Sequence, residues 1–95
     1  MEFAFDLTKS EANKAKHGLD FVQAQALWNG FGVTGPLTFR GEDRWLRVGI
    51  LQSHHWLAVF VKRNGRVRLI SVRRARKDEV KLHDDAERRE HDHQS

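Results

Sequence analysis

The dipeptide Asn64-Gly65 is the feature that most constrains how this chain can fold. It lies between two apolar-rich runs, residues 56–62 and 67–72. Asn and Gly both tolerate positive φ, so the pair favours a two-residue type I′ turn, whose twist matches that of antiparallel strands. A third strand-like run, residues 44–51, comes before this hairpin and is joined to it by residues 52–55. The sequence therefore predicts a three-stranded antiparallel meander.

Signals for a first helix precede the strands. Residues 8–11 read Thr-Lys-Ser-Glu, which matches a capping box, and either Asp6 or Thr8 can serve as the N-cap. The helix is predicted to continue to His17 and to end at Gly18, which tolerates the left-handed conformation of a C-cap.

A second helix is predicted directly after the first. Asp20 is the expected N-cap and Gln23 its capping-box partner. Apolar residues recur at helical spacing over residues 21–28, which gives this helix one apolar face. Asn29-Gly30 is expected to end it.

The remaining segments carry weaker signals. Residues 3–5 fit a short opening strand, and residues 31–39 form an edge strand or a loop because Pro36 lacks an amide hydrogen. Residues 76–89 have a thin apolar stripe and are predicted to form a C-terminal helix that docks weakly. Residues 91–95 are expected to be a disordered tail.

Together these elements predict one α+β domain spanning residues 1–90, with two N-terminal helices packed on the antiparallel meander and a helix at the C-terminus. A chain of 95 residues forms only a modest core. It has no cysteine, so packing or a partner must stabilise it.

The basic charge is concentrated in one block. Residues 44–77 carry ten Lys and Arg and no Asp or Glu, whereas residues 1–43 and 78–95 are acidic on balance. Such a block is typical of a protein that binds a polyanion, here RNA or DNA. The alternative is a solvated charged surface without a ligand.

Several classes of protein are excluded by the composition. The absence of cysteine rules out thiol catalysis and thiolate-ligated metal sites. The N-terminus has no signal-peptide pattern, and the longest apolar stretch, residues 56–61, is far shorter than a membrane helix. We therefore expect a cytoplasmic protein that does not bind a membrane.

Arginines crowd the end of the meander. The two-residue period of a strand places the even-numbered residues of the run 66–72 on one face, including Arg66 and Arg68. Arg73 and Arg74 follow at its exit, on opposite faces. Guanidinium groups pair with phosphate oxygens through two parallel hydrogen bonds, so this strand end is a candidate phosphate site. Alternatively, the charges protect a sheet edge from aggregation or pair with acidic residues elsewhere in the chain.

His17 is the best candidate for proton transfer, because histidine exchanges protons near neutral pH. Lys9, Asn13, Lys16 and His17 recur at spacings of three and four, so they can share one polar helix face. The alternative is that His17 only interacts with the negative end of the helix dipole.

The other histidines and the tryptophans are weaker candidates. His54 and His55 are placed in a turn, and His83 is placed in the acidic helix. His91 and His93 lie in the expected tail, and no spacing matches a known metal motif, so we expect no metal and no cofactor. The three tryptophans are expected in the core, although Trp45 and Trp56 have the alternative of stacking on bases.

Three sequence elements, in this order, resemble the BrnT family of ribonuclease toxins over about residues 3–82. The first is the pattern of Phe5, Asp6, Lys9, Asn13, Lys16, His17, Gly18 and Phe21, and it is the most specific. The second is Gly41-Glu42-Asp43-Arg44 with Gly49, and the third is residues 68–75 followed by Glu79.

The resemblance implies a compact fold akin to the RelE-type toxins and an endoribonuclease that arrests translation. It also implies a cognate antitoxin with a ribbon-helix-helix domain, through which the complex contacts operator DNA.

On this basis we expect metal-independent cleavage in which the ribose 2′-hydroxyl attacks the adjacent phosphorus. His17, or Lys16 in its place, would move protons, while Arg68 and Arg73 would stabilise the developing charge. The residues expected to bind the RNA backbone are Lys9, Asn13, Arg44, Arg66 and Arg74. Two alternatives stay open: a non-catalytic nucleic-acid-binding module, and an interaction protein whose basic face docks an acidic partner or its own acidic C-terminal segment.

Overall fold

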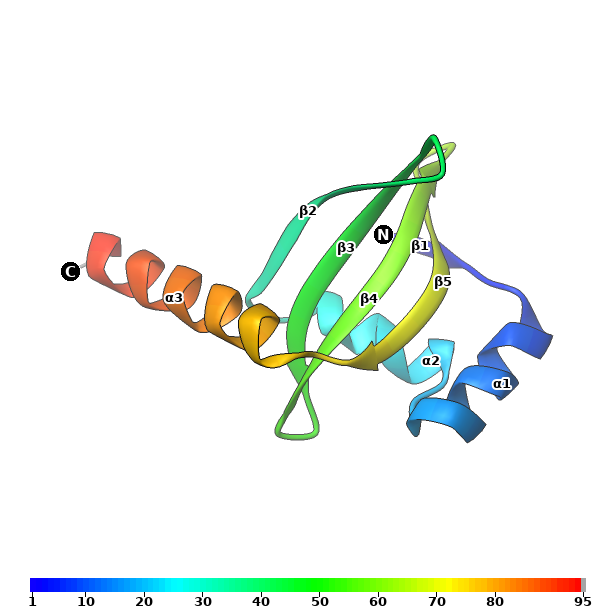
Figure 1. Cartoon of the computed structure of the whole chain (residues 1–95), viewed down its shortest axis with the longest axis horizontal. Helices are drawn as coiled ribbons and strands as arrows, with labels where there is room; N and C mark the ends of the chain where they lie inside the picture. The colour runs from blue at the N-terminus through cyan, green and yellow to red at the C-terminus, as the bar shows by residue number, and fades with distance from the viewer. Residues whose placement is uncertain (95) are drawn as a thin grey trace.

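A computed structural model describes residues 1–94 and forms an α+β domain built on one mixed five-stranded sheet (Figure 1). The order of strands across the sheet is β1-β5-β4-β3-β2. The elements along the chain are β1 (Glu2–Ala4), α1 (Leu7–His17), α2 (Phe21–Ala24), the 3₁₀ turn η1 (Gln25–Trp28), β2 (Gly32–Phe39), β3 (Glu42–Leu51), β4 (His54–Arg63), β5 (Arg66–Arg74) and α3 (Lys77–Gln94).

Strands β2 to β5 form an antiparallel meander that is connected by two-residue turns. The predicted turn at Asn64-Gly65 is confirmed, with φ values of 53° and 75°. Gln52 and Ser53 also have positive φ, and Leu51 pairs directly with His54 across that turn. The prediction that residues 52–55 form the connection was therefore wrong in its second half, because β4 already begins at His54.

Of the two alternatives for residues 31–39, an edge strand or a loop, the edge strand is the one that forms. Residues 32–39 form β2, an edge strand that pairs only with β3, so Pro36 costs no hydrogen bond on the open side. At the other edge, β1 pairs in parallel with the start of β5 over residues 66–68. This parallel pair makes the sheet mixed rather than purely antiparallel.

The helix ends follow the capping rules with one correction. Asp6 is the N-cap of α1, and its Oδ1 accepts a hydrogen bond from the Lys9 amide at 3.1 Å. Thr8 lies inside the helix, so the predicted capping box at residues 8–11 does not form. Gly18 ends α1 at φ 89°, and Asp20 and Gln23 form the predicted reciprocal capping box.

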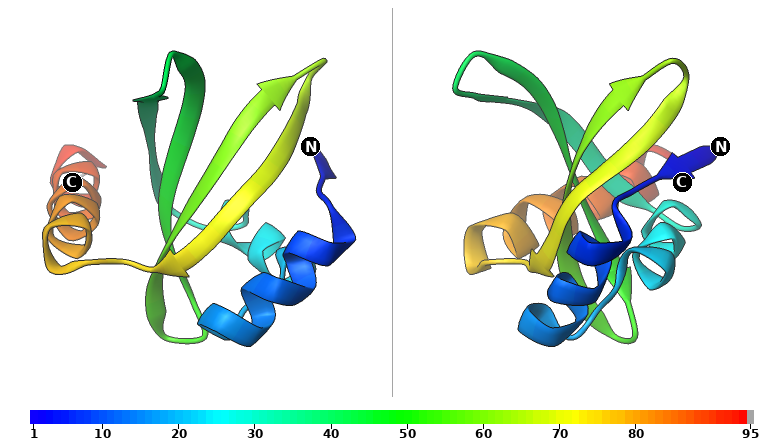
Figure 2. Two further views of the ribbon diagram at one scale, coloured as in Figure 1. Left: turned by 45° about the vertical axis from the view of Figure 1, so that its right-hand side comes forward. Right: turned by 90° about the vertical axis from the view of Figure 1, so that its right-hand side faces the viewer.

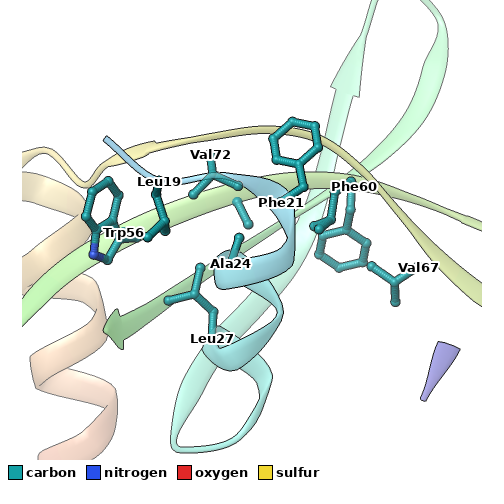
Figure 3. Packing of buried hydrophobic residues seen from close by; sticks show 10 residues of the cluster. Leu19, Phe21, Ala24, Leu27, Trp56, Phe60, Val67 and Val72 are labelled. Atoms are coloured by element: carbon teal, nitrogen blue, oxygen red, sulfur yellow. The ribbon is translucent and has the colours of Figure 1, made fainter. Parts of the chain in front are cut away.

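The main core lies between one face of the sheet and the α1–α2–η1 segment (Figure 3). Leu19, Phe21, Ala24 and Leu27 are buried at 0–1 % exposure. They pack against buried strand residues, which include Trp56, Phe60, Val67 and Val72. Removing this apolar surface from water is the dominant stabilising contribution.

A β-bulge in β5 changes which arginines share a face. Val59 pairs with Ser71, but the next residue, Phe60, pairs with Leu69, so Ile70 is left as the extra residue. A bulge reverses the in-and-out alternation of a strand. Val72 therefore points into the core at 0 % exposure, and not to the face of Arg66 and Arg68 as the simple period predicted.

Helix α3 docks on the opposite face of the sheet. The left view of Figure 2 shows the strands between α3 and the pair α1 and α2. His83 of α3 is fully buried, and its ring contacts the rings of Phe31 and His55 at centroid distances of 5.3 and 4.9 Å. The later turns of α3 extend away from the sheet (Figure 1).

The C-terminal helix is longer than predicted. It runs to Gln94, so residues 91–94 are helical where the sequence analysis expected a disordered tail. Residues 87–90 read Glu-Arg-Arg-Glu, which are good helix formers, and the helix propagates from them into residues 91–94. Ser95 lies outside the described residues.

Gly32 gives Arg47 the space to bind the 3₁₀ turn. Arg47 donates hydrogen bonds to the carbonyl oxygens of Leu27 and Gly30 and to the Thr34 hydroxyl, each at 2.9–3.0 Å. A Cβ atom on Gly32 would lie 2.5 Å from Cζ of Arg47. Arg47 is therefore used by the fold and is not available to a ligand.

We expect Gly32→Ala to displace Arg47 and to lower the free energy of unfolding by about 1–3 kcal/mol, since carbonyls lose a charged donor. Urea unfolding measures this. Gly35→Ala is the matched control, because it lies on the same strand and its Cβ meets nothing within 4 Å. Equal losses in the two variants would contradict the role assigned to Arg47.

Candidate functional site

Arginines line the face of the sheet opposite α1 and α2. Because of the bulge, Arg66, Arg68 and Arg73 of β5 share this face. Arg63 of β4 pairs directly with Arg66 across the Asn64-Gly65 turn, so it joins them. This positive strip runs the length of β5 and is the clearest candidate for a polyanion-binding surface.

The strip begins in a pocket at the tip of the β4–β5 hairpin. Its lining residues are Ala4, Arg63, Asn64, Arg66 and Arg68. We call it the hairpin pocket. Three arginines from two strands line it, and guanidinium groups are suitable partners for phosphate oxygens.

Two of the three arginines in the hairpin pocket remain available to a ligand. Arg66 pairs with Glu2 at 2.8 Å, but both side chains are at least 60 % exposed, so water screens this pair. Within residues 1–94, Arg63 and Arg68 form no ion pair. The pocket therefore keeps a net positive charge that an anion can neutralise.

At the far end of β5, Arg73 is held by Glu79 of α3. Two hydrogen bonds of 2.8 and 2.9 Å join the guanidinium to the carboxylate, and Glu79 also accepts from the Arg76 amide. The hydrogen bond and charge of Glu79 raise the pKa of Arg73, and the Arg73 hydrogen bond lowers the pKa of Glu79. Arg73 thus anchors the start of α3, which for this arginine matches the alternative that it pairs with an acidic residue of the chain.

This anchor predicts an acid-dependent loss of stability. The folded-state pKa of Glu79 lies below its unfolded value of about 4.3. Ionised Glu79 therefore stabilises the fold above that value, and the contribution is lost as the pH falls through the folded pKa. We expect the melting temperature of Glu79→Gln to fall less steeply than that of the parent between about pH 5 and pH 2.

Thermal unfolding across this pH range measures the effect, with Glu11→Gln as the control. Glu11 is exposed on α1, away from α3. If Glu11→Gln changed the slope as much as Glu79→Gln, the anchor would not be its origin.

Arg44 and Arg74 were both expected to bind RNA, and the structure places them apart. Arg44 of β3 forms an ion pair with Glu42 at 3.0 Å. Arg74 lies on the face of the sheet that α1 and α2 cover, with its guanidinium 5.5 Å from the centroid of the Trp56 ring. Trp56 itself is buried and donates to the Leu51 carbonyl, which confirms its place in the core.

Asn13 is part of the fold and not of an exposed polar face. Its Nδ2 donates to the carbonyl oxygens of Leu19 and Val72 at 2.7 and 2.9 Å, and its Oδ1 accepts from the Val72 amide at 3.1 Å. It is only 7 % exposed. The two bonds to Val72 satisfy the backbone of β5 beyond the part that pairs with β1. Because the Asn13 side chain is buried and its hydrogen bonds are used by the fold, we remove Asn13 from the RNA-binding set.

The Asn13 bonds also fix where the last turn of α1 lies. Helix α1 runs beside β5 in the same direction (Figure 2). Its C-terminal residues Lys16 and His17 therefore lie toward the Arg73 end of the strand. Lys9 and Lys16 are exposed and His17 is half-buried. Among residues 1–94, no hydrogen bond joins Lys16 or His17 to Arg68 or Arg73.

The predicted site is therefore spread along β5. Arg68 and Val72 are four residues apart, about 13 Å along a strand. The hairpin pocket lies at one end, whereas Lys16 and His17 lie toward the other end on the α1 side of the sheet and Arg73 lies there on the opposite face. Arg63, which the sequence analysis missed, follows from the turn itself, because a two-residue turn at 64–65 makes residues 63 and 66 direct neighbours.

No helix among the described residues is long and apolar enough to cross a membrane. A search of curated proteins finds no match to this chain. The family model for the ribonuclease toxin BrnT of type II toxin–antitoxin systems matches residues 5–79. This match covers most of the chain, including α1, the meander and the Arg73–Glu79 pair. The chain therefore belongs to the BrnT family of ribonuclease toxins of type II toxin–antitoxin systems.

Proposed function

We propose that this toxin is a metal-independent, cytoplasmic endoribonuclease that cuts RNA and so stops translation, and that the hairpin pocket is where it holds the RNA backbone. The observation that carries the proposal is that three arginines line this pocket, two of them without an ion pair in residues 1–94. RNA offers a phosphate at every nucleotide, which matches a positive strip that continues from this pocket along β5.

The proposed reaction needs only groups of the chain and the RNA itself. The ribose 2′-hydroxyl loses its proton to a general base and attacks the adjacent phosphorus. The bond to the 5′-oxygen of the next nucleotide breaks, and that oxygen takes up a proton. The products are a 2′,3′-cyclic phosphate and a 5′-hydroxyl end.

The proton-transfer role is assigned to His17, or to Lys16 in its place, because both lie on the last turn of α1 beside the exit of β5. Arg73 lies at the same end of β5 but on the opposite face of the sheet from α1, and its bidentate pairing with Glu79 fixes its orientation. Because the hairpin pocket lies at the other end of the strand, Arg68 binds a neighbouring phosphate in this arrangement. Lys9 and the exposed arginines contribute further backbone contacts.

Membership of a type II toxin family implies a cognate antitoxin. We propose that this antitoxin carries a ribbon-helix-helix domain and that operator DNA is contacted through it. A likeness of the fold to the RelE-type toxins belongs to the same proposal. A bound antitoxin would raise the melting temperature of the toxin, because it binds the folded state only.

The test is an assay of binding and cleavage with labelled single-stranded RNA in EDTA. We expect cleavage by the parent, and an apparent Kd for RNA that rises about 10- to 100-fold in Arg63→Ala/Arg68→Ala, from loss of charge-assisted phosphate contacts. The slope of log Kd against log salt should also become shallower. Arg89→Ala is the control, since this exposed arginine on α3 carries the same charge away from the pocket.

The main alternative is a non-catalytic nucleic-acid-binding module, for which the same hairpin pocket would serve. Binding without cleavage, in EDTA and with added metals, would favour it if expression of the chain also left bacterial growth unaffected. An unchanged Kd in Arg63→Ala/Arg68→Ala would instead reject the hairpin pocket as the RNA site.

The structure bears on the third possibility, in which the acidic C-terminal segment covers the basic face. The ion pairs between α3 and residues 44–77 include Arg73–Glu79 and the contact of His55 with Asp84, and both lie in the first half of α3, away from the hairpin pocket. The later turns of α3 extend away from the sheet (Figure 1). The hairpin pocket is thus left uncovered by α3.

A further inference from the structure

We propose that His55, His83 and Asp84 form a binding site for a divalent transition-metal ion of the Zn²⁺ type, placed between β4 and α3. This inference does not depend on RNA cleavage, and it concerns residues that the proposed reaction does not use. It also revises the expectation, based on sequence spacing, that the chain has no metal site.

The donor atoms are already gathered. Oδ1 of Asp84 lies 2.9 Å from Nε2 of His55 and 3.0 Å from Nδ1 of His83. All three donor atoms lie within 4.8 Å of one another. In a tetrahedral zinc site with bonds of about 2.0–2.1 Å, two ligand atoms are roughly 3.3 Å apart. Small movements of the side chains would therefore admit an ion.

One ligand is held rigidly. His83 is fully buried and its ring is packed edge-on against Phe31 and His55. Its Nδ1 is directed at Asp84, while its Nε2 is buried and has no hydrogen-bond partner in the described part of the chain. Coordination of a metal ion at Nδ1 would place the ring proton on Nε2 and leave that atom as it is, so the support for the site comes from the approach of the three donor atoms.

The other two ligands are accessible from solvent. The side chain of Asp84 is 48 % exposed and that of His55 is 22 % exposed. An ion can therefore enter from the Asp84 side, and with three protein ligands a fourth position stays open for water. Two imidazoles and one carboxylate suit Zn²⁺, Ni²⁺ or Cu²⁺ better than Mg²⁺ or Ca²⁺, which prefer oxygen ligands.

The position of the site gives it a structural consequence. His55 belongs to β4 near its start, whereas His83 and Asp84 belong to α3. A bound ion would connect the sheet to the one helix whose later turns leave it. Because the ion binds the folded state, it should raise the melting temperature in proportion to the logarithm of its concentration.

The experiment is calorimetric titration of the full chain with Zn²⁺, together with the visible absorption of bound Co²⁺ as a report of tetrahedral coordination. We expect one saturable site whose affinity falls at least about 10-fold in His55→Ala and in Asp84→Asn, the lower bound seen even for groups that only orient a metal ligand. Both residues are partly exposed, so these variants are expected to fold, and their melting temperatures without metal check this.

Two controls separate this site from other histidines. His54→Ala removes the neighbouring histidine, which is exposed. His91→Ala/His93→Ala removes the His-x-His pair near the C-terminus. The proposal is overturned if Zn²⁺ does not saturate one site, if His55→Ala and Asp84→Asn bind like the parent, or if only the His91→Ala/His93→Ala variant loses binding.

Discussion

Replacing His17 by alanine is expected to lower the rate of RNA cleavage at saturating RNA by about 10²- to 10⁴-fold, the range that general acid–base groups contribute. His17 is the last residue of α1, directly before the left-handed Gly18. Alanine has the higher helix propensity at this position, so the helix should remain intact. RNA binding should change little, because the hairpin pocket lies at the other end of β5.

Single-turnover cleavage of labelled RNA, with the affinity measured separately, distinguishes these effects. His54→Ala is the matched control, since it removes a histidine from the turn-proximal end of β4 without touching α1. If His17→Ala cleaves like the parent while Lys16→Ala does not, the proton-transfer role belongs to Lys16. If both variants cleave like the parent, neither residue is the general base and the last turn of α1 has no catalytic role.

The parts of the fold that depend on neighbouring residues were predictable from the sequence. The turn at Asn64-Gly65, the cap at Gly18 and the capping box of Asp20 and Gln23 all arise from contacts within a few residues. The turn at Gln52-Ser53 was misplaced because neither residue is one that usually adopts positive φ. His55 was therefore placed in a connection and not on a strand, and its contacts with His83 and Asp84 of α3 were not predicted.

What the sequence could not predict depends on partners far along the chain. The bulge at Ile70 follows from the register between β4 and β5, and no local pattern of β5 reveals it. The parallel pairing of β1 with β5 joins residues more than sixty positions apart. Both features decide the site, since the first turns Arg73 toward the face of Arg68 and the second places Ala4 in the hairpin pocket.

The charge of the basic block indicated the class of ligand, but it did not show which role each arginine has. Ten basic residues between positions 44 and 77 indicated a polyanion site. In the structure, Arg47 binds the 3₁₀ turn and Arg73 anchors α3, whereas Arg63 and Arg68 remain available. A count of charges gives the class of ligand, and only the contacts show which arginines are left to bind it.

Asn13→Ala is expected to lower the free energy of unfolding by about 2–4 kcal/mol, because it leaves buried backbone groups of Leu19 and Val72 without partners. For a domain of this size, that corresponds to a fall in melting temperature of roughly 10–25 °C. Asn13→Asp should not rescue it, since a carboxylate can accept from the Val72 amide but cannot donate to the two carbonyls.

Thermal and urea unfolding measure the loss, and Asn29→Ala is the control because Asn29 is exposed. The same variants also separate the two roles considered for Asn13. As a structural residue, its loss lowers stability while RNA affinity, measured well below the melting temperature, stays near that of the parent. An Asn13→Ala variant as stable as Asn29→Ala but unable to bind RNA would instead return Asn13 to the RNA-binding set. It would also mean that the link between α1 and β5, from which the position of His17 was inferred, does not hold in solution.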